Sequence, residues 1–89
     1  MAMGSSEVEK VVSGMAAKSG KELNWRYSVV DLMTLLGIDN SMVNRRALAT
    51  ELGYTGDLND SATMNTYLHK AIMEKLAEND GKVPATLLD

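Results

Sequence analysis

The sequence contains no cysteine, no phenylalanine, one histidine and one proline in 89 residues. Without cysteine, the chain has no disulfide, no thiolate metal ligand and no thiol nucleophile. A zinc site would need carboxylates for all ligands beyond the single histidine, so we expect no metal and no cofactor. The absence of cysteine also suits a cytoplasmic protein, and this is the location that we expect.

Aromatic residues are scarce as well, with one tryptophan and three tyrosines, whereas there are seven methionines. Leucine, methionine, valine and alanine must therefore form the core. Sheets favour aromatic and β-branched residues, so this composition favours packed helices. The length fits one small domain. We expect an all-α fold, a compact bundle of four main helices with a short C-terminal turn or fifth helix.

The charge balance is mildly acidic, with a net charge of −3 at pH 7. Such a chain lacks the broad positive field that draws a protein to phosphate backbones, so nucleic acid is an unfavoured partner. No apolar run approaches the roughly 18 residues of a membrane span, and the first residues lack the pattern of a signal peptide. We expect residues 1–5 to be a disordered N-terminus or an expression remnant, and residues 6–89 to form a single helical domain.

Apolar residues at helical spacing predict a first helix from Glu7 to Lys18. Ser5 or Ser6 is the expected cap of this helix. A connector from Lys21 to Tyr27 follows. It contains Trp25, the only tryptophan, which we expect to be buried against the last long helix because a small domain rarely leaves its largest apolar side chain in water.

The second helix is predicted from Ser28 to Leu36. The Ser28 hydroxyl is expected to accept a backbone N–H of the first turn. The Asp31 carboxylate is expected to reach back and accept another free backbone N–H, as in a capping box. This segment is apolar on nearly all sides, which predicts the central and most buried helix. Gly37 is expected to end it in the left-handed conformation.

A third helix is predicted from about Ser41 to Leu52, with Val43 facing inward and Arg45 outward. Its cap comes from Asp39-Asn40-Ser41. The fourth helix is the longest, capped by Ser61 or Asp60 and reaching about Asn79. A last turn over Ala85 to Leu88 follows an extended Val83-Pro84 pair.

Short polar side chains gather in the loop before the fourth helix. The spacing of a calcium loop, with side-chain oxygens at its first, third and fifth positions, is matched by Asp57, Asn59 and Ser61. An EF-hand then needs glycine at the sixth position and glutamate at the twelfth, where this chain has Ala62 and Leu68. Turn formation and helix capping by Asp57, Asn59 and Asp60 explain the pattern better.

The segment from Arg46 to Tyr54 is similar to the first helix and turn of a helix-turn-helix motif. In that interpretation Asn65 would read an adenine from the start of the next helix. However, Asp57 and Asp60 would face the phosphate backbone and repel it. The cations available for phosphate contacts are Arg26, Arg45, Arg46 and Lys70.

His69 is the only candidate general base. Catalysis also needs an orienting acid and a nucleophile, and no acidic residue lies on the preceding helical turn. We therefore expect a surface or half-buried histidine that bonds locally, and no enzymatic activity. Of the adjacent Arg45 and Arg46, we expect one to bond the acidic loop or a helix C-terminus and the other to be solvated.

These observations favour a non-enzymatic helical protein-interaction module, whose protein partner the sequence does not identify. The alternative is a helix-turn-helix-like nucleic-acid-binding domain. Arginine is enriched at binding hot spots, which makes the two arginines candidate contacts. The candidate interaction residues are Arg45, Arg46, Asp57, Asn59, Asp60, Asn65 and His69.

Several motifs together give the chain a family resemblance. They are Trp25 to Leu32, Arg46 to Asp57, Asn59 to Asn65, Leu68-His69-Lys70 and Lys82-Val83-Pro84. From about Leu23 to Leu88 the chain resembles a small bacterial helical domain family, also found in some viruses, of unknown function. The resemblance implies about five α-helices and a flexible N-terminal connection, and no activity that could assign a residue. Typical members have a longer Ala/Pro-rich N-terminal region, and a Trp where this chain has Tyr67.

Overall fold

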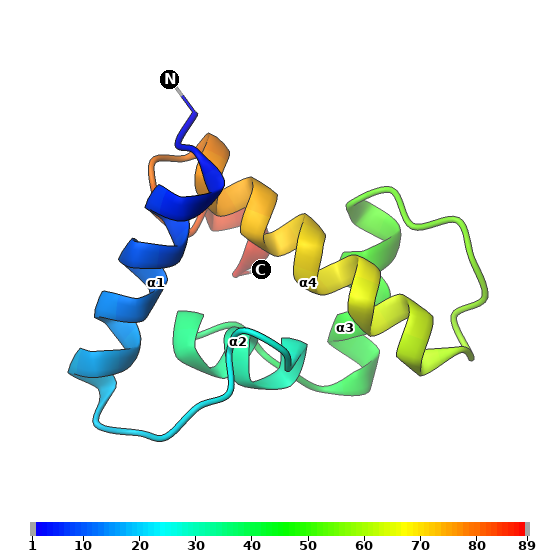
Figure 1. The fold of residues 1–89 in the computed structure, drawn as a ribbon. Helices are drawn as coiled ribbons and strands as arrows, with labels where there is room; N and C mark the ends of the chain where they lie inside the picture. Colours follow the sequence, from blue (N-terminus) through cyan, green and yellow to red (C-terminus); the bar gives the residue numbers. More distant parts are fainter. Residues whose placement is uncertain (1, 89) are drawn as a thin grey trace.

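Residues 2–88 are described by this computed structural model, and they contain four α-helices and one 3-10 turn joined by loops (Figure 1). Their order is α1 (Ser5–Ser19), α2 (Val29–Leu36), α3 (Met42–Glu51), α4 (Ser61–Glu78) and η1 (Ala85–Leu87). The predicted all-α bundle with a short C-terminal turn is confirmed. What we expected of Met1 and Asp89 lies outside the described residues. Within residues 2–88, no helix is both long enough and apolar enough to cross a membrane.

The central helix is α4, which crosses the molecule and packs against α1, α2 and α3 (Figure 1). Its inner face is fully buried at steps of four residues, at Met64, Leu68, Ile72 and Leu76. The second helix is the most buried, as predicted, because half of its residues are buried and none is exposed, but the prediction that it is central is wrong. Length is the reason: α2 is about 12 Å long, whereas α4 is about 27 Å long and reaches all three partners.

The ends of α2 follow the predicted signals, with one difference. The Ser28 hydroxyl accepts the Asp31 backbone N–H at 3.2 Å, and Gly37 ends the helix at φ 74°. The Asp31 carboxylate, however, accepts the backbone N–H of Asn24 at 2.8 Å rather than returning to Ser28. Asp31 therefore fastens the connector to α2 instead of completing a capping box.

The start of α1 lies earlier than predicted. The helix begins at Ser5 with Gly4 as its N-cap, so neither serine is the cap. The Gly4 N–H is instead satisfied by the Glu7 carboxylate at 3.3 Å. The backbone N–H of Met3 donates to the carbonyl of Ala77 at 2.9 Å, which ties the segment before α1 to the end of α4.

The orientation of α3 also differs from the prediction. Val43 is 77% exposed, whereas Arg45 is half-buried and Leu48 is buried. The side that faces the core begins at Met42, one residue earlier than expected. Val43 lies about 100° further round the helix than Met42, and in the observed orientation this turns it away from the core and into solvent.

Candidate functional site

The loop before α4 is held by its own polar side chains. Asp57 Oδ1 accepts the backbone N–H of Asn59 at 2.8 Å. Asp60 is the N-cap of α4 and accepts the Thr63 hydroxyl at 2.8 Å and the Thr63 backbone N–H at 3.2 Å. These two hydrogen bonds, the hydroxyl first, lower the pKa of Asp60 from its ordinary value. The predicted turn and cap are confirmed, with Asp60 as the capping residue.

Two tyrosines fasten this loop to α4. The Tyr54 and Tyr67 rings lie 5.3 Å apart at a tilt of 46°. The Tyr54 hydroxyl donates to the Asp57 carbonyl at 3.1 Å, and the Tyr67 hydroxyl donates to the Leu52 carbonyl at 2.8 Å. Desolvation raises the pKa of Tyr54, and nearby carboxylates raise it further. These contacts fix the start of the loop on α4, whereas residues 55–60 are exposed to solvent.

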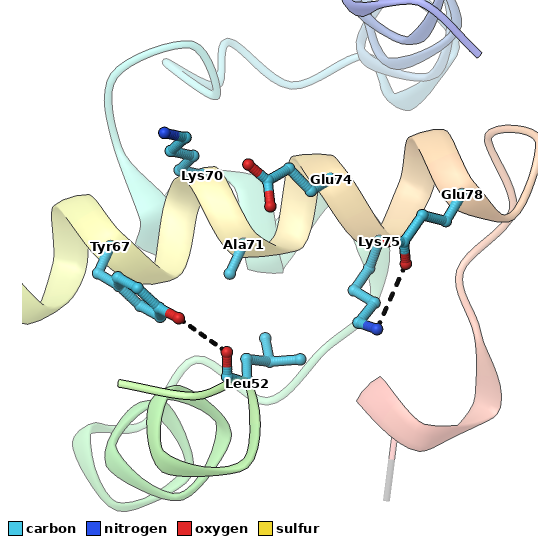
Figure 2. Close-up of a pocket in the computed structure, with 7 residues that line it drawn as sticks. All are labelled: Leu52, Tyr67, Lys70, Ala71, Glu74, Lys75 and Glu78. Atoms are coloured by element: carbon cyan, nitrogen blue, oxygen red, sulfur yellow. Dashed lines mark hydrogen bonds and ion pairs between the residues drawn. The ribbon is translucent and has the colours of Figure 1, made fainter. Parts of the chain in front are cut away.

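A hollow of about 330 Å³ lies between the end of α3 and the middle of α4 (Figure 2). Figure 2 shows Tyr67, Ala71 and Lys75 on the side of α4 that faces Leu52, whereas Lys70 points away. The lining also includes Glu74 and Glu78, and Glu78 pairs with Lys75 at 3.3 Å. Two lysines therefore balance two glutamates, so the charges of this hollow do not select a ligand.

Arg45 and Asn65 lie together, and their contact is structural. Arg45 Nη1 donates to Asn65 Oδ1 at 3.0 Å, and Arg45 Nε donates to the Asn40 carbonyl at 3.1 Å. The predicted bond to the acidic loop or a helix C-terminus is wrong, because Arg45 lies in the first turn of α3 beside neutral acceptors. Arg46 is exposed, and within residues 2–88 its side chain makes no ion pair or hydrogen bond.

His69 joins α4 to the connector. Its Nε2 lies 2.6 Å from the backbone carbonyl oxygen of Trp25, a residue 44 positions away. The ring is half-buried, as expected, but its partner is distant in sequence rather than local. Trp25 itself is 6% exposed, which confirms that it is buried, and its carbonyl contact places it against α4.

Beside His69, the surface carries a hollow of about 490 Å³ between the connector and the first half of α4. We call it the Tyr27 hollow, because Tyr27 on its edge is 84% exposed. Of the candidate residues, Asn65 and His69 line it, and Arg45 adjoins it through Asn65. The other candidates are not in its lining. The full lining is Arg26, Tyr27, Val29, Ala62, Asn65, Thr66, His69 and Lys70.

The sequence reasoning missed Tyr27 as a surface residue. Tyr27 directly precedes the N-cap Ser28, a position where an apolar residue often packs against its own helix as a hydrophobic staple. Here the ring is exposed instead. The sequence pattern alone does not distinguish a stapled ring from an exposed one, because the outcome depends on the path of the connector.

A second hollow of about 490 Å³, which we call the Met73 groove, lies between α1 and the second half of α4. It shares Arg26, His69 and Lys70 with the Tyr27 hollow, so the two adjoin along α4. Its apolar wall consists of Met3, Val8, Trp25, Met73 and Ala77. Ser5, Glu9 and Glu74 complete its lining, so the polar stretch of α4 is followed by one in which apolar side chains lie beside two carboxylates.

Two cations stand where the hollows meet, and they have different surroundings. The Arg26 guanidinium lies 4.4 Å from the centre of the Trp25 ring and 3.7 Å from the Glu9 carboxylate. Lys70, by contrast, has no carboxylate within 4.0 Å among the described residues. Arg26 is thus held in place by stacking on Trp25 and by pairing with Glu9, whereas the Lys70 ammonium is available to an anionic group of a ligand.

Comparisons with known proteins agree with the resemblance seen in the sequence. The family described as "Domain of unknown function (DUF3597)" matches residues 1–84. The solution structure of a conserved unknown protein from Rhodopseudomonas palustris is similar, with 50% sequence identity over 90% of this chain and a TM-score of 0.56. The chain spans 58% of the length of that protein's chain. No curated protein matches at a significant level.

Proposed function

The chain belongs to this family of unknown function, and we propose that it is a non-enzymatic protein-interaction module that binds its partner at the Tyr27 hollow. The observation that carries the proposal is the exposure of Tyr27, at 84%, on the edge of a concave surface. Tyrosine is enriched at protein interfaces because it offers a large contact area and a hydroxyl with few rotatable bonds. An exposed tyrosine beside a hollow is therefore a suitable anchor.

The neighbours of Tyr27 support the same role. Arg26 and Tyr27 are of residue types that are frequent at hot spots. The backbone beneath them is fixed, because His69 bonds the Trp25 carbonyl and Asp31 bonds the Asn24 N–H. A surface that is ordered before binding loses less entropy when it meets its partner.

The surroundings of His69 support a non-enzymatic role. A general base is usually oriented by an acid and placed beside a nucleophile. Among the described residues, the His69 ring makes one hydrogen bond, to the Trp25 carbonyl. Its role in the proposal is therefore to hold the binding surface in shape.

The experiment is affinity capture from native lysate with the wild type, Tyr27→Ala and Val43→Ala. Val43 is the matched control because it is also highly exposed, at 77%, but lies on α3 outside the Tyr27 hollow. We expect a protein that is captured by the wild type and Val43→Ala and lost with Tyr27→Ala. Direct titration with the purified partner should reproduce the difference.

The proposal would be overturned if all three baits captured the same proteins. It would also be overturned by binding to random duplex DNA that weakens steeply with salt, because that dependence marks phosphate neutralisation. Variants of Arg45 or Asn65 are less suitable for this first test, since their mutual hydrogen bond supports the fold.

A further inference from the structure

We infer that the Tyr27 hollow binds a carboxylate-bearing segment of a protein partner, with the carboxylate contacting Lys70 and Arg26. This inference rests on the proposed function and specifies the chemistry of its partner. Its basis is charge complementarity. The lining contains two permanent cations and no carboxylate, in a chain whose net charge is −3. A positive patch on an acidic protein favours an acidic segment and disfavours basic ones.

A neutral donor adds to the two cations. Arginine only donates hydrogen bonds, so the contact with Arg45 fixes Oδ1 as the Asn65 atom that faces Arg45. The Asn65 Nδ2 group then has no hydrogen-bond acceptor within residues 2–88. Because Asn65 lines the Tyr27 hollow, its amide is a donor for an incoming oxygen. Arg45 acts here as a positioning residue.

The amount of charge favours a carboxylate over a phosphate. Arg26 already shares its charge with Glu9, whereas Lys70 is unpaired among the described residues. Arg26 and Lys70 carry two positive charges, and the pairing of Arg26 with Glu9 leaves about one of them to be compensated, which one carboxylate does. A phosphate monoester carries nearly two negative charges, and a nucleic acid strand brings another with every further nucleotide, so both would be under-compensated here.

The Met73 groove supplies the rest of the surface. It continues from Arg26 and Lys70 along α4, and its apolar wall includes Met73 and Trp25. Its lining also holds Glu9 and Glu74, so the carboxylate of the segment stays at the Tyr27 hollow and only an uncharged side chain suits the groove. A segment whose carboxylate meets Lys70 can place a neighbouring aliphatic side chain against Met73. Methionine suits such a role because its flexible side chain adapts to different shapes. The expected segment thus combines an acidic residue with a nearby aliphatic one.

Selection from a short random-peptide library displayed on phage, with the full chain as bait, tests this inference. We expect the selected peptides to share an Asp or Glu next to an aliphatic residue. In a fluorescence-polarisation titration with one selected peptide, replacing its acid by the matching amide should weaken binding about tenfold. Lys70→Met should weaken it about fivefold, whereas Lys18→Met, at an exposed position on α1, should leave it unchanged.

Asn65→Asp is the sharpest variant. It gives Arg45 an ionic partner, so the fold is retained, but it replaces the amide donor by a repelling carboxylate. We expect it to abolish peptide binding without lowering the midpoint of urea unfolding. Undiminished binding by Asn65→Asp, with the same peptide, would overturn the inference.

The remaining outcomes separate this inference from the proposed function. Peptides that need Tyr27 but lack a shared acid would overturn the acidic partner and leave the interaction module standing. Failure to select any peptide over a Tyr27→Ala bait would count against both. Salt-sensitive binding of random duplex DNA that is lost in Lys70→Met would assign the hollow to nucleic acid and overturn both.

Discussion

His69 Nε2 lies 2.6 Å from the backbone carbonyl oxygen of Trp25, and this contact joins α4 to the connector between α1 and α2. The connector has no regular secondary structure, so its position depends on such contacts. Of its residues, Trp25 is buried in the core, whereas Arg26 and Tyr27 are exposed on the surface. The histidine thus links the core of the molecule to its candidate binding surface.

Replacing His69 by alanine should lower the free energy of unfolding by about 1–2 kcal/mol, because a part-buried carbonyl loses its hydrogen bond. His69→Gln keeps a donor on a side chain of similar reach and should lose less. The measurement is urea unfolding followed by circular dichroism. Lys70→Ala, on the next and exposed position, is the control and should change stability little. Equal losses in His69→Ala and His69→Gln would show that the hydrogen bond is not the cause.

Trp25→Ala should cost about 3–5 kcal/mol, the usual range for removing a large buried aromatic residue. In a domain this small, that is most of the stability. The native indole should emit at short wavelength and resist quenching by acrylamide. Tyr27→Ala, two residues away and exposed, should cost less than about 0.5 kcal/mol. Emission close to that of free tryptophan would contradict the buried position.

Features encoded within a few residues were predictable from the sequence. The Ser28 cap, the Gly37 stop and the last turn after Pro84 each depend on local hydrogen bonds and backbone preferences, and all three are present. The burial of Trp25 was also predictable, because a small domain rarely leaves its largest apolar side chain in water.

Features that depend on packing were less predictable. The exposure of Val43 and the central position of α4 follow from which helices meet, and a helical period does not contain that information. The same limit applies to the site. Asn65 and His69 were chosen for their chemistry, and the structure brings them to one hollow. Tyr27 was missed because its exposure results from the tertiary path of the connector.

The caps give a paired prediction. Ser28→Ala should lower the free energy of unfolding by about 1 kcal/mol, because the Asp31 N–H loses its acceptor. Ser61→Ala should change it by less than about 0.5 kcal/mol, because Ser61 lies inside α4 after the Asp60 cap. Urea unfolding of the two variants measures the difference. A loss of similar size at Ser61 would move the start of α4 to that residue.

The lowered pKa of Asp60 predicts an acid-dependent part of the stability. The hydrogen bonds from Thr63 favour the ionised carboxylate in the folded state, so its folded pKa lies below the ordinary value of 3.8. This contribution is present above that ordinary value and is lost as the pH falls through the lower, folded pKa. Asp60→Asn should keep a cap, since asparagine is also a good N-cap, but remove this part of the pH dependence.

The test is the urea midpoint of the wild type and Asp60→Asn from neutral pH downward through the acid range. The difference between the two should be constant near neutral pH and shrink in acid. Thr63→Val removes the hydroxyl donor and should diminish that change. A difference between wild type and Asp60→Asn that stays constant throughout the acid range would show that Asp60 titrates alike in the folded and unfolded chain.

Two glycines should respond in opposite directions to alanine. Gly14 lies in the middle of α1 with open space around its Cα, so Gly14→Ala should raise the free energy of unfolding by about 0.5–1 kcal/mol. Gly81 follows α4 at φ 80° and is buried, and a Cβ there would lie 2.9 Å from Val11 Cγ1. Gly81→Ala should therefore cost about 2 kcal/mol or more, from left-handed strain and from overpacking against α1.

Thermal unfolding of Gly14→Ala and Gly81→Ala measures the two effects, and Val11→Ala, alone and combined with Gly81→Ala, separates the two causes at Gly81. Removing the Val11 methyl groups relieves the contact but leaves the backbone strain, so the double variant should recover part of the loss beyond the sum of the single effects. No recovery would mean that the backbone conformation alone requires glycine. Additive effects would also show that the Gly81–Val11 contact does not determine how α1 packs on the end of α4. That packing would then depend on the Met3–Ala77 hydrogen bond and on the buried Val8 and Val12.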